Sequence, residues 1–325
     1  MQPNATPSPQ RLLVIKHGAL GDIVQGFGAF ASLRAGHPAA HIALLTTSPY
    51  VELAKMMPWF DEVLVDRRAG ITHLWESYRM RRVIRYSWDM IIDLQCSQRT
   101  ARYFQFFARP DTKWIGTARG CSDPCPDFSG INNYQRMSIA AEMAGGAPDI
   151  PDLGWLLDGA RSSVTDALTQ TLAEKPVQSY AVLVPGCSLS KPEKRWPAEN
   201  FAALARRFID NNISVVLTGT AADKNVVDMV ESLAPGAINL CGQTSIADLA
   251  RLYASAVSIV GNDTGPVFLA AATGAPTIMV MGPDTNPSMS APTGPCCDWV
   301  QGKPITEVRD DDVWRALQRL ASSYI

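Results

Sequence analysis

Residues 257–282 read VSIVGNDTGPVFLAAATGAPTIMVMG, in the order expected for a strand, a tight polar turn, a helix and a second strand. Residues 256–260 are apolar and rich in β-formers, whereas Gly261 and Gly265 enclose a polar turn. Pro266 suits a first helical position, and Gly274 precedes a new apolar run at 276–281. The stretch therefore predicts a βαβ unit of a parallel sheet.

The turn of this unit opens onto a helix N-terminus, where unpaired backbone N–H groups and the helix dipole favour a phosphate or another anion. A simpler interpretation is that Asp263 or Thr264 only caps the helix, since both residue types are favoured caps. The position of the turn favours a ligand, because open α/β sheets bind ligands at the carboxyl ends of their strands.

The same pattern extends through the whole chain, which at 325 residues is long enough for two domains. Residues 98–108, 133–145 and 198–209 read as helices. The alternation predicts an α/β protein with two doubly wound, Rossmann-like parallel sheets facing one another across a cleft. We expect a leader at 1–10 and domains at 11–165 and 166–325. Strands are predicted at 11–16, 41–46, 62–65, 88–94, 113–116, 180–184, 213–218, 237–240, 256–260 and 277–281.

Composition and charge argue against several classes of protein. A net charge of −2 and a pI near 6.1 argue against general nucleic-acid binding. No apolar run approaches the roughly 20 residues that span a bilayer, and the opening MQPNATPSPQ has no apolar core of a signal peptide. We therefore expect a cytoplasmic protein. The seven cysteines suit reduced thiols, and Cys121 with Cys125 has no second pair at zinc-site spacing, so no metal site is expected.

Two glycine-containing patterns follow the first predicted strand and could belong to a functional site. The series Gly26, Gly28 and Ala31 matches G-x-G-x-x-A, but it begins ten residues past the strand, inside the expected helix, so a dinucleotide fingerprint is rejected. The turn at residues 18–22 follows the strand directly and places Asp22 at the start of a helix. From this turn alone, the favoured interpretation is that Asp22 is an N-cap, with a catalytic role as the alternative.

Basic residues gather in two places. Lys194 and its neighbours follow a strand in the second half, where a lysine can reach a phosphate, although a solvated basic loop explains them equally well. Residues 67–119 contain eleven basic and four acidic residues, a net charge of +7. This local excess predicts an anionic acceptor or an anionic membrane surface, with part of the arginines lying on exposed helix faces.

Five segments of the chain occur together in this order: HGALGDIVQ, WDMIIDLQ, PGCSLSKPEKRWP, INLCGQTSIADLARLYASA and VGNDTGPVFLAAATGAPTIMVMGP. This combination resembles glycosyltransferase family 9, the ADP-heptose:lipopolysaccharide heptosyltransferases. The resemblance covers residues 11–320 and implies the B-type glycosyltransferase fold, with acceptor binding in the first domain and nucleotide-sugar binding in the second. It implies an anionic lipopolysaccharide-core acceptor and peripheral contact with the inner membrane.

Family roles carry over to matching positions. Asp22 corresponds to the proposed general base, and Lys194 to the lysine on the donor diphosphate. The remaining donor positions are Ser188, Ser190, Asp223 for the ribose, Thr244 beside adenine, and Asp263, Thr264 and Gly265 at the sugar and phosphates. The acceptor positions are Arg67, Arg68 and Arg119. The chain departs from the family at Phe268, where many members have histidine, and at 282–287, where GPDTNP replaces GPTDP.

The resemblance implies direct displacement with inversion at the anomeric carbon and no cofactor. Asp22 would accept the proton of the acceptor hydroxyl, and Lys194 with the helix amides would stabilise the departing diphosphate without a metal. Three alternatives stay open: transfer from another nucleotide sugar, a sugar-nucleotide epimerase of the same architecture, and a nucleotide-sugar-binding protein without catalysis. Turnover without an acceptor would indicate the epimerase, and binding without turnover the third.

Overall fold

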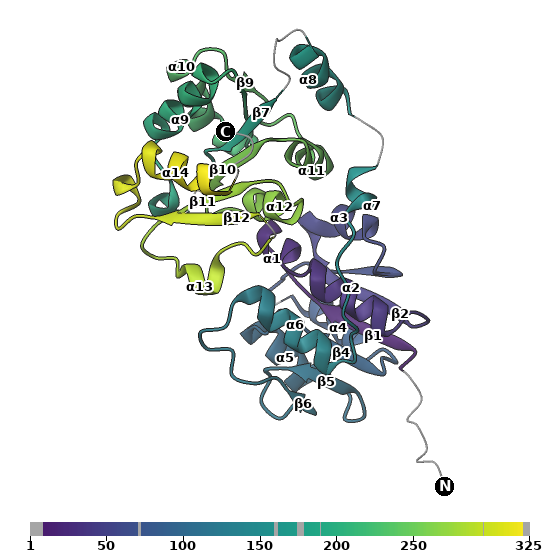
Figure 1. Cartoon of the computed structure of the whole chain (residues 1–325). Helices are drawn as coiled ribbons and strands as arrows, with labels where there is room; N and C mark the ends of the chain where they lie inside the picture. Colours follow the sequence, from purple (N-terminus) through teal and green to yellow (C-terminus); the bar gives the residue numbers. More distant parts are fainter. Residues whose placement is uncertain are drawn as a thin grey trace. The chain divides into compact units, whose positions relative to one another are not determined.

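The computed structural model describes residues 9–70, 73–158, 162–173, 179–188, 190–294 and 296–320. The chain divides into two compact units, Met1–Trp155 and Leu156–Ile325, each built on its own sheet (Figure 1). Residues 1–8 of the predicted leader lie outside the described residues. The short helix α7 (Gly154–Leu157) contains the division, which falls ten residues before the predicted boundary at 165/166.

The first unit contains a six-stranded parallel sheet with strand order β3-β2-β1-β4-β5-β6. Leu13 and Ile15 of β1 face a core completed by α4 and α5, whereas the alternate residues Leu12 and Val14 are buried on the other face. The strands are β1 Arg11–Ile15, β2 His41–Thr47, β3 Glu62–Asp66, β4 Met90–Asp93, β5 Lys113–Gly116 and β6 Asp123–Pro124. The helices are α1 Leu20–Val24, α2 Phe27–Gly36, α3 Val51–Met56, α4 Leu74–Ile84, α5 Gln98–Phe107 and α6 Asn133–Met143.

The second unit repeats this strand order as β12-β11-β10-β7-β8-β9, again all parallel. Phe201 and Phe208 of α9 and Trp314 of α14 complete the core on one face of the sheet. The strands are β7 Tyr180–Val184, β8 Ser214–Leu217, β9 Ile238–Asn239, β10 Ser258–Asn262, β11 Thr277–Met281 and β12 Cys297–Gln301. The helices are α8 Ser163–Ala173, α9 Ala198–Asp210, α10 Lys224–Leu233, α11 Ile246–Ala254, α12 Gly265–Ala272, α13 Pro287–Ser290 and α14 Asp310–Leu320.

Two local predictions need correction. The single helix expected after β1 is broken into α1 and α2, because the N–H of Gly26 bonds to the Ile23 carbonyl at 3.0 Å and ends the first helix. The strand expected at 256–260 is instead β10, two residues further on, so that Gly261 and Asn262 belong to the sheet. A Cβ on Gly261 would lie 2.6 Å from Val267, which shows how closely α12 packs on this strand.

The strand order places a topological switch point in each sheet. The chain runs from β1 outward through β2 to β3, and then returns to the other side of β1 with β4. In the second unit the same reversal separates β7 from β10. Doubly wound sheets bind ligands outside the carboxyl ends of the strands at such a point. A functional site is therefore expected in the loops after β1, β4, β7 and β10.

Candidate functional site

In the second unit, an ion pair joins the loops after β7 and β10. The Lys194 ammonium lies 2.5 Å from Asp263 Oδ2, and the Thr285 hydroxyl donates to the same oxygen at 2.8 Å. The Asp263 side chain is 8% exposed and that of Lys194 24% exposed. An ammonium has three donors, so this bond leaves Lys194 two further donors for a ligand. The predicted residues Lys194 and Asp263 are thus brought together, and Thr285 was missed.

Asn262 holds these two loops in place, although no role was predicted for it. Its buried amide donates to the Pro185 carbonyl at 2.8 Å and accepts from the Trp196 N–H at 2.9 Å. These bonds connect the end of β10 to both ends of the loop that carries Lys194. An asparagine at the end of an apolar strand was the available signal, because a buried amide requires partners.

The helix α12 begins at Gly265, one residue before the predicted first position at Pro266. Thr264 is its N-cap residue, but no side chain caps the helix, and its first turn contains no acidic residue. Thr264 thus occupies the predicted cap position, but its side chain makes no cap hydrogen bond, and Asp263 is not the cap. Asp263 instead binds Lys194 and Thr285. Phe268, at the departure from the family pattern, is buried in this helix.

The other donor candidates follow neighbouring strands of the same sheet. Ser188 and Ser190 lie in the loop after β7, with their hydroxyls 3.0 Å apart. Asp223, after β8, accepts hydrogen bonds from the N–H and hydroxyl of Thr220 with one carboxylate oxygen. A Cβ on Gly186 would lie 2.4 Å from the Asp223 carboxyl carbon, so a glycine is needed there. Thr244 is half-buried in the loop after β9.

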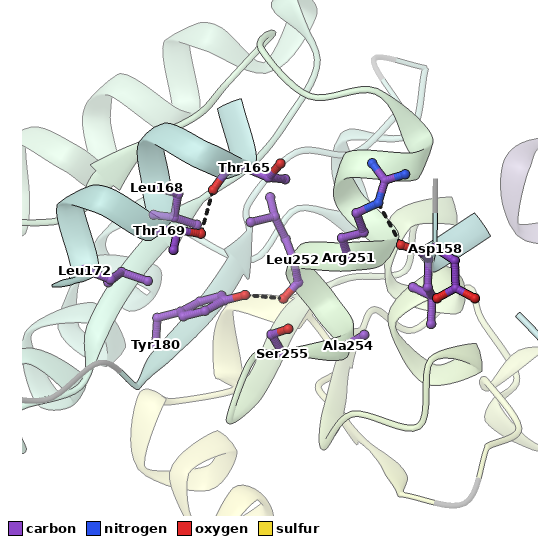
Figure 2. Close-up of a pocket in the computed structure, with 11 residues that line it drawn as sticks. Asp158, Thr165, Leu168, Thr169, Leu172, Tyr180, Arg251, Leu252, Ala254 and Ser255 are labelled. Carbon is purple, nitrogen blue, oxygen red and sulfur yellow. Dashed lines mark hydrogen bonds between the residues drawn. The ribbon is translucent and has the colours of Figure 1, made fainter. Parts of the chain in front are cut away.

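A separate pocket of about 590 Å³ lies between α8 and α11 in the second unit (Figure 2). Tyr180, the first residue of β7, donates from its hydroxyl to the Leu252 carbonyl at 2.8 Å in its wall. The Arg251 side chain donates to the Leu157 carbonyl at 2.9 Å. This pocket lies at the amino end of β7, the opposite end from Lys194 and Asp263. It therefore does not belong to the candidate donor site.

In the first unit, Asp22 lies in the first turn of α1 and is partly exposed. The N-cap residue is Ala19, so the alternative that Asp22 is the N-cap is wrong. The Asp22 carboxylate lies 3.9 Å from the Lys16 ammonium and accepts from the Asn133 amide at 3.4 Å. A carboxylate held beside a buried cation, yet 41% exposed, is available to accept a proton from a bound hydroxyl.

Two buried charged residues support this turn and were missed from the sequence. Lys16 follows β1 and Asp93 ends β4, on the two sides of the switch point. Burial lowers the pKa of Lys16, and the carboxylates of Asp22 and Asp93 oppose that shift. Burial raises the pKa of Asp93 to about 6, although N–H groups of Gln95 and Cys96 donate to it. Charged residues at the ends of apolar strands were the signal for this group.

The predicted acceptor arginines lie at the same edge of the sheet but not together. Arg67 and Arg68 follow β3, whereas Arg119 is exposed after β5, which is four strand positions away. At about 4.8 Å per strand, the two sets are roughly 19 Å apart. Arg67 pairs with Glu76 at 3.0 Å, and Arg68 adopts a left-handed backbone with φ 50°. An acceptor that contacts both sets must therefore be elongated.

Asp66, at the end of β3, organises the region around Arg68. Its carboxylate accepts from the Tyr103 hydroxyl at 2.6 Å and from the Arg68 N–H at 2.7 Å. The His17 ring lies 3.2 Å from the same carboxylate. Burial lowers the pKa of His17 to about 4, so the ring is neutral near pH 7. Arg99 donates to the Arg68 carbonyl at 3.1 Å and fixes the strained residue.

Among the residues that the structure describes, no cluster of three or more His, Cys, Asp or Glu side chains could hold a metal ion. All seven cysteines are free thiols. No helix within the described ranges is long and apolar enough to cross a membrane.

The chain is similar in sequence to proteins of known family. Residues 146–302 match glycosyltransferase family 9 (heptosyltransferase). Lipooligosaccharide heptosyltransferase 2 of Haemophilus influenzae is 26% identical over 303 residues, which cover 86% of this chain and 85% of that protein. Lipopolysaccharide heptosyltransferase 2 of Escherichia coli is 25% identical over 302 residues, covering 87% of this chain and 85% of that protein.

Solved structures share the fold. A family 9 glycosyl transferase from Veillonella parvula matches with a TM-score of 0.78 at 20% identity, covering 96% of this chain and 97% of that one. The E. coli heptosyltransferase WaaC with ADP matches with a TM-score of 0.74 at 18% identity, covering 96% of this chain and 100% of that one. The predicted B-type glycosyltransferase fold, with two six-stranded parallel sheets, is confirmed. The chain contains a glycosyltransferase family 9 domain at residues 146–302 and is a glycosyltransferase.

Proposed function

We propose that this protein transfers a heptose from ADP-heptose to an anionic acceptor in the lipopolysaccharide inner core, with inversion at the anomeric carbon. Support comes from the relatives named lipooligosaccharide or lipopolysaccharide heptosyltransferases and from a solved neighbour with ADP-2-deoxy-2-fluoro heptose. Within this chain, the observation that carries the proposal is the Lys194–Asp263 pair at the β7/β10 switch point, next to the uncapped start of α12.

The second unit would supply the groups that bind the donor and stabilise the departing diphosphate. Asp263, which also accepts from Thr285, holds Lys194 in position, and the positive end of the α12 dipole adds positive potential. As the bond from the anomeric carbon to the diphosphate breaks, its electron pair moves to the departing ADP. Fixed positive charge stabilises this developing anion, so the proposed step uses no metal. Ser188 and Ser190 would add hydroxyl donors, and Asp223 and Thr244 would bind the nucleoside.

The first unit would supply the nucleophile. Asp22 takes the proton of the acceptor hydroxyl as its oxygen attacks the anomeric carbon. A single attack from the face opposite the diphosphate inverts the configuration. Arg67, Arg68 and Arg119 would bind anionic groups of the acceptor. Because the relatives are named for lipopolysaccharide or lipooligosaccharide, we also propose that the protein works in peripheral contact with a membrane.

The nucleotide needs a direct test, because the fold does not select the base. A solved neighbour with UDP and another with UDP and glucose both match with a TM-score of 0.54 at 13% identity. ADP, UDP and GDP should therefore be compared by thermal shift. A ligand at 100 times its Kd stabilises a native protein by about 2.7 kcal/mol. We expect ADP to stabilise the protein more than UDP or GDP, and equal stabilisation by UDP would contradict the adenine assignment.

Assays of turnover then distinguish a glycosyltransferase from an epimerase and from a binding protein without catalysis. ADP-heptose with a lipopolysaccharide-core acceptor should give ADP and a heptosylated product, also in the presence of a chelator. Conversion of the donor without an acceptor would indicate an epimerase. Binding of every donor without turnover would indicate a protein that has lost catalysis. Lys194→Ala should reduce both ADP affinity and kcat, whereas Lys191→Ala in the same loop should affect both far less.

A further inference from the structure

The helix α4 exposes large apolar side chains on the face turned away from the core. Leu74 is 80% exposed, Trp75 72% and Tyr78 52%, and the rings of Trp75 and Tyr78 lie 5.8 Å apart. Met80 and Ile84 are buried against the sheet. Packing in the core therefore explains the apolar residues on one face of this helix but not those on the exposed face. Three neighbouring exposed apolar residues in the first turns indicate a binding surface, since single ones are common but clusters are not.

The neighbouring helix α5 extends this surface. Phe106 is 70% exposed, although Tyr103 on the same helix is buried in the core. A cavity of about 760 Å³ lies between the two helices, with Phe106, Phe107 and Met80 among its apolar walls. Arg102 lines the same cavity. The two helices therefore offer exposed aromatic groups around a partly apolar hollow, with basic groups at its side.

The charge of this surface is strongly positive. Helices α4 and α5 together contain five arginines and one acidic residue, Glu76. Glu76 is already engaged, because both Arg67 and Arg79 form ion pairs with it. Arg81, Arg82 and Arg102 are exposed. We call the set Leu74, Trp75, Tyr78, Phe106, Arg81, Arg82 and Arg102 the α4–α5 surface.

We propose that the α4–α5 surface binds the headgroup region of an anionic lipid bilayer. Exposed Trp, Tyr, Phe and Leu beside arginine is the combination found in helices that lie in a membrane interface, where apolar groups enter the acyl boundary and guanidinium groups bind phosphates. The ion pair from Glu76 to Arg67 connects this surface to the proposed acceptor site. A lipid-anchored acceptor in that bilayer would then present its sugars close to Arg67. The inference deepens, and in this respect rests on, the proposed function.

The test is flotation of the full chain with vesicles that contain no glycolipid acceptor. We expect binding to vesicles of phosphatidylcholine mixed with phosphatidylglycerol, weaker binding at high salt, and little binding to phosphatidylcholine alone. Each arginine near an anionic surface contributes about 1 kcal/mol, which is roughly fivefold in affinity. Arg81→Gln with Arg82→Gln should therefore weaken binding roughly 30-fold, and Trp75→Ser with Tyr78→Ser should weaken it to a similar degree.

A matched control lies in the second unit, where Trp299→Ser with Arg315→Gln removes an exposed tryptophan and an exposed arginine. This variant should bind vesicles like the unmodified chain. Each variant is also assayed for stabilisation by ADP and for transfer to a delipidated, water-soluble acceptor, which separates loss of folding or catalysis from loss of membrane binding. No binding of the unmodified chain to these acceptor-free anionic vesicles, or equal binding by all variants, would overturn the proposal.

Discussion

At the scale of single residues, Asp22 offers the clearest separation between a structural and a catalytic role. Ala19 occupies the N-cap position, so Asp22 contributes to α1 only as an acidic residue in its first turn. A charge there is worth about 0.3–1 kcal/mol. Its carboxylate faces the Lys16 ammonium and remains partly exposed. Asparagine keeps a polar side chain at this position and removes only the charge facing Lys16, which is partly screened because Asp22 is 41% exposed.

We predict that Asp22→Asn lowers kcat by at least ~10²-fold, because asparagine has no basic site for the acceptor proton. The free energy of unfolding should change by less than about 1 kcal/mol. The measurements are initial rates with ADP-heptose and chemical unfolding. Glu199→Gln is the control, since it removes an acidic residue from the first turn of α9. Near-normal turnover by Asp22→Asn would rule out the base assignment.

Asp93 leads to a prediction about pH. Its pKa is raised to about 6 from a model-compound value of 3.8, because the carboxyl is buried. The folded state then binds more protons than the unfolded state between these values. The stability contributed by the neutral carboxyl is fully present below pH 3.8 and is lost as pH rises through about 6.

Replacement by asparagine removes this titration while keeping an oxygen for the N–H groups of Gln95 and Cys96. The difference in unfolding free energy between Asp93→Asn and the unmodified protein should therefore shift in favour of the variant as pH rises from 4 to 7. The shift should be about 1.4 kcal/mol for each unit of pKa displacement. Urea unfolding at several pH values measures it. A difference that stays constant with pH would show that Asp93 titrates normally.

At the scale of elements, apolar runs predicted the fold well. The ranges 113–116, 180–184 and 277–281 match β5, β7 and β11, because buried parallel strands are continuous apolar stretches. Two elements of the second unit were missed. The strand β12 lies at the edge of its sheet and has no continuous buried apolar run, and α14 begins with three aspartates. Acidic residues in a first turn were an unused signal for α14.

The candidate site was predictable only where a motif or a strand end marked it. Lys194 and Asp263 could be predicted individually, but their ion pair depends on the neighbouring positions of β7 and β10 in the sheet. Thr285 reaches Asp263 from a third loop, which no local pattern connects to the first two. The left-handed backbone of Arg68 is held by a local hydrogen bond to Asp66 and by Arg99, and the second of these is a tertiary contact that no local pattern shows.

The arrangement of the loops after β3 and β5 predicts how the acceptor binds. Replacing Arg67, Arg68 and Arg119 by alanine should raise the acceptor KM and make activity less sensitive to salt, because each change removes positive charge facing an anion. ADP affinity should remain nearly unchanged. Arg206→Ala in α9 is the control for removal of a surface arginine. An equal loss of ADP affinity in the Arg67, Arg68 and Arg119 variant would contradict the division of labour between the two units.

At the scale of the whole molecule, the two units repeat one topology but hold different chemistry at equivalent places. The loop after β1 contains buried Lys16 and partly exposed Asp22, whereas the corresponding loop after β7 contains Lys194, paired with Asp263. Both loops flank the switch point of their own sheet. The sequence predicted this repetition, because strands and helices alternate in both halves. The sequence also placed Asp22 and Lys194 after the first strand of each half, but it did not show that β1 and β7 lie beside the switch points of their sheets.

This division predicts where ADP protects the backbone from hydrogen exchange. Donor binding should slow exchange in the loop after β7 and at the start of α12, since phosphate oxygens would accept hydrogen bonds from N–H groups there. The loops after β1 and β3 should exchange at unchanged rates with ADP alone. Lys194→Ala, measured at the same ADP concentration, should show less protection, because the diphosphate loses a cation while the strands of the sheet remain intact. Protection centred on Asp22 and Arg67 instead would place the nucleotide in the first unit and reverse the assignment of the two halves.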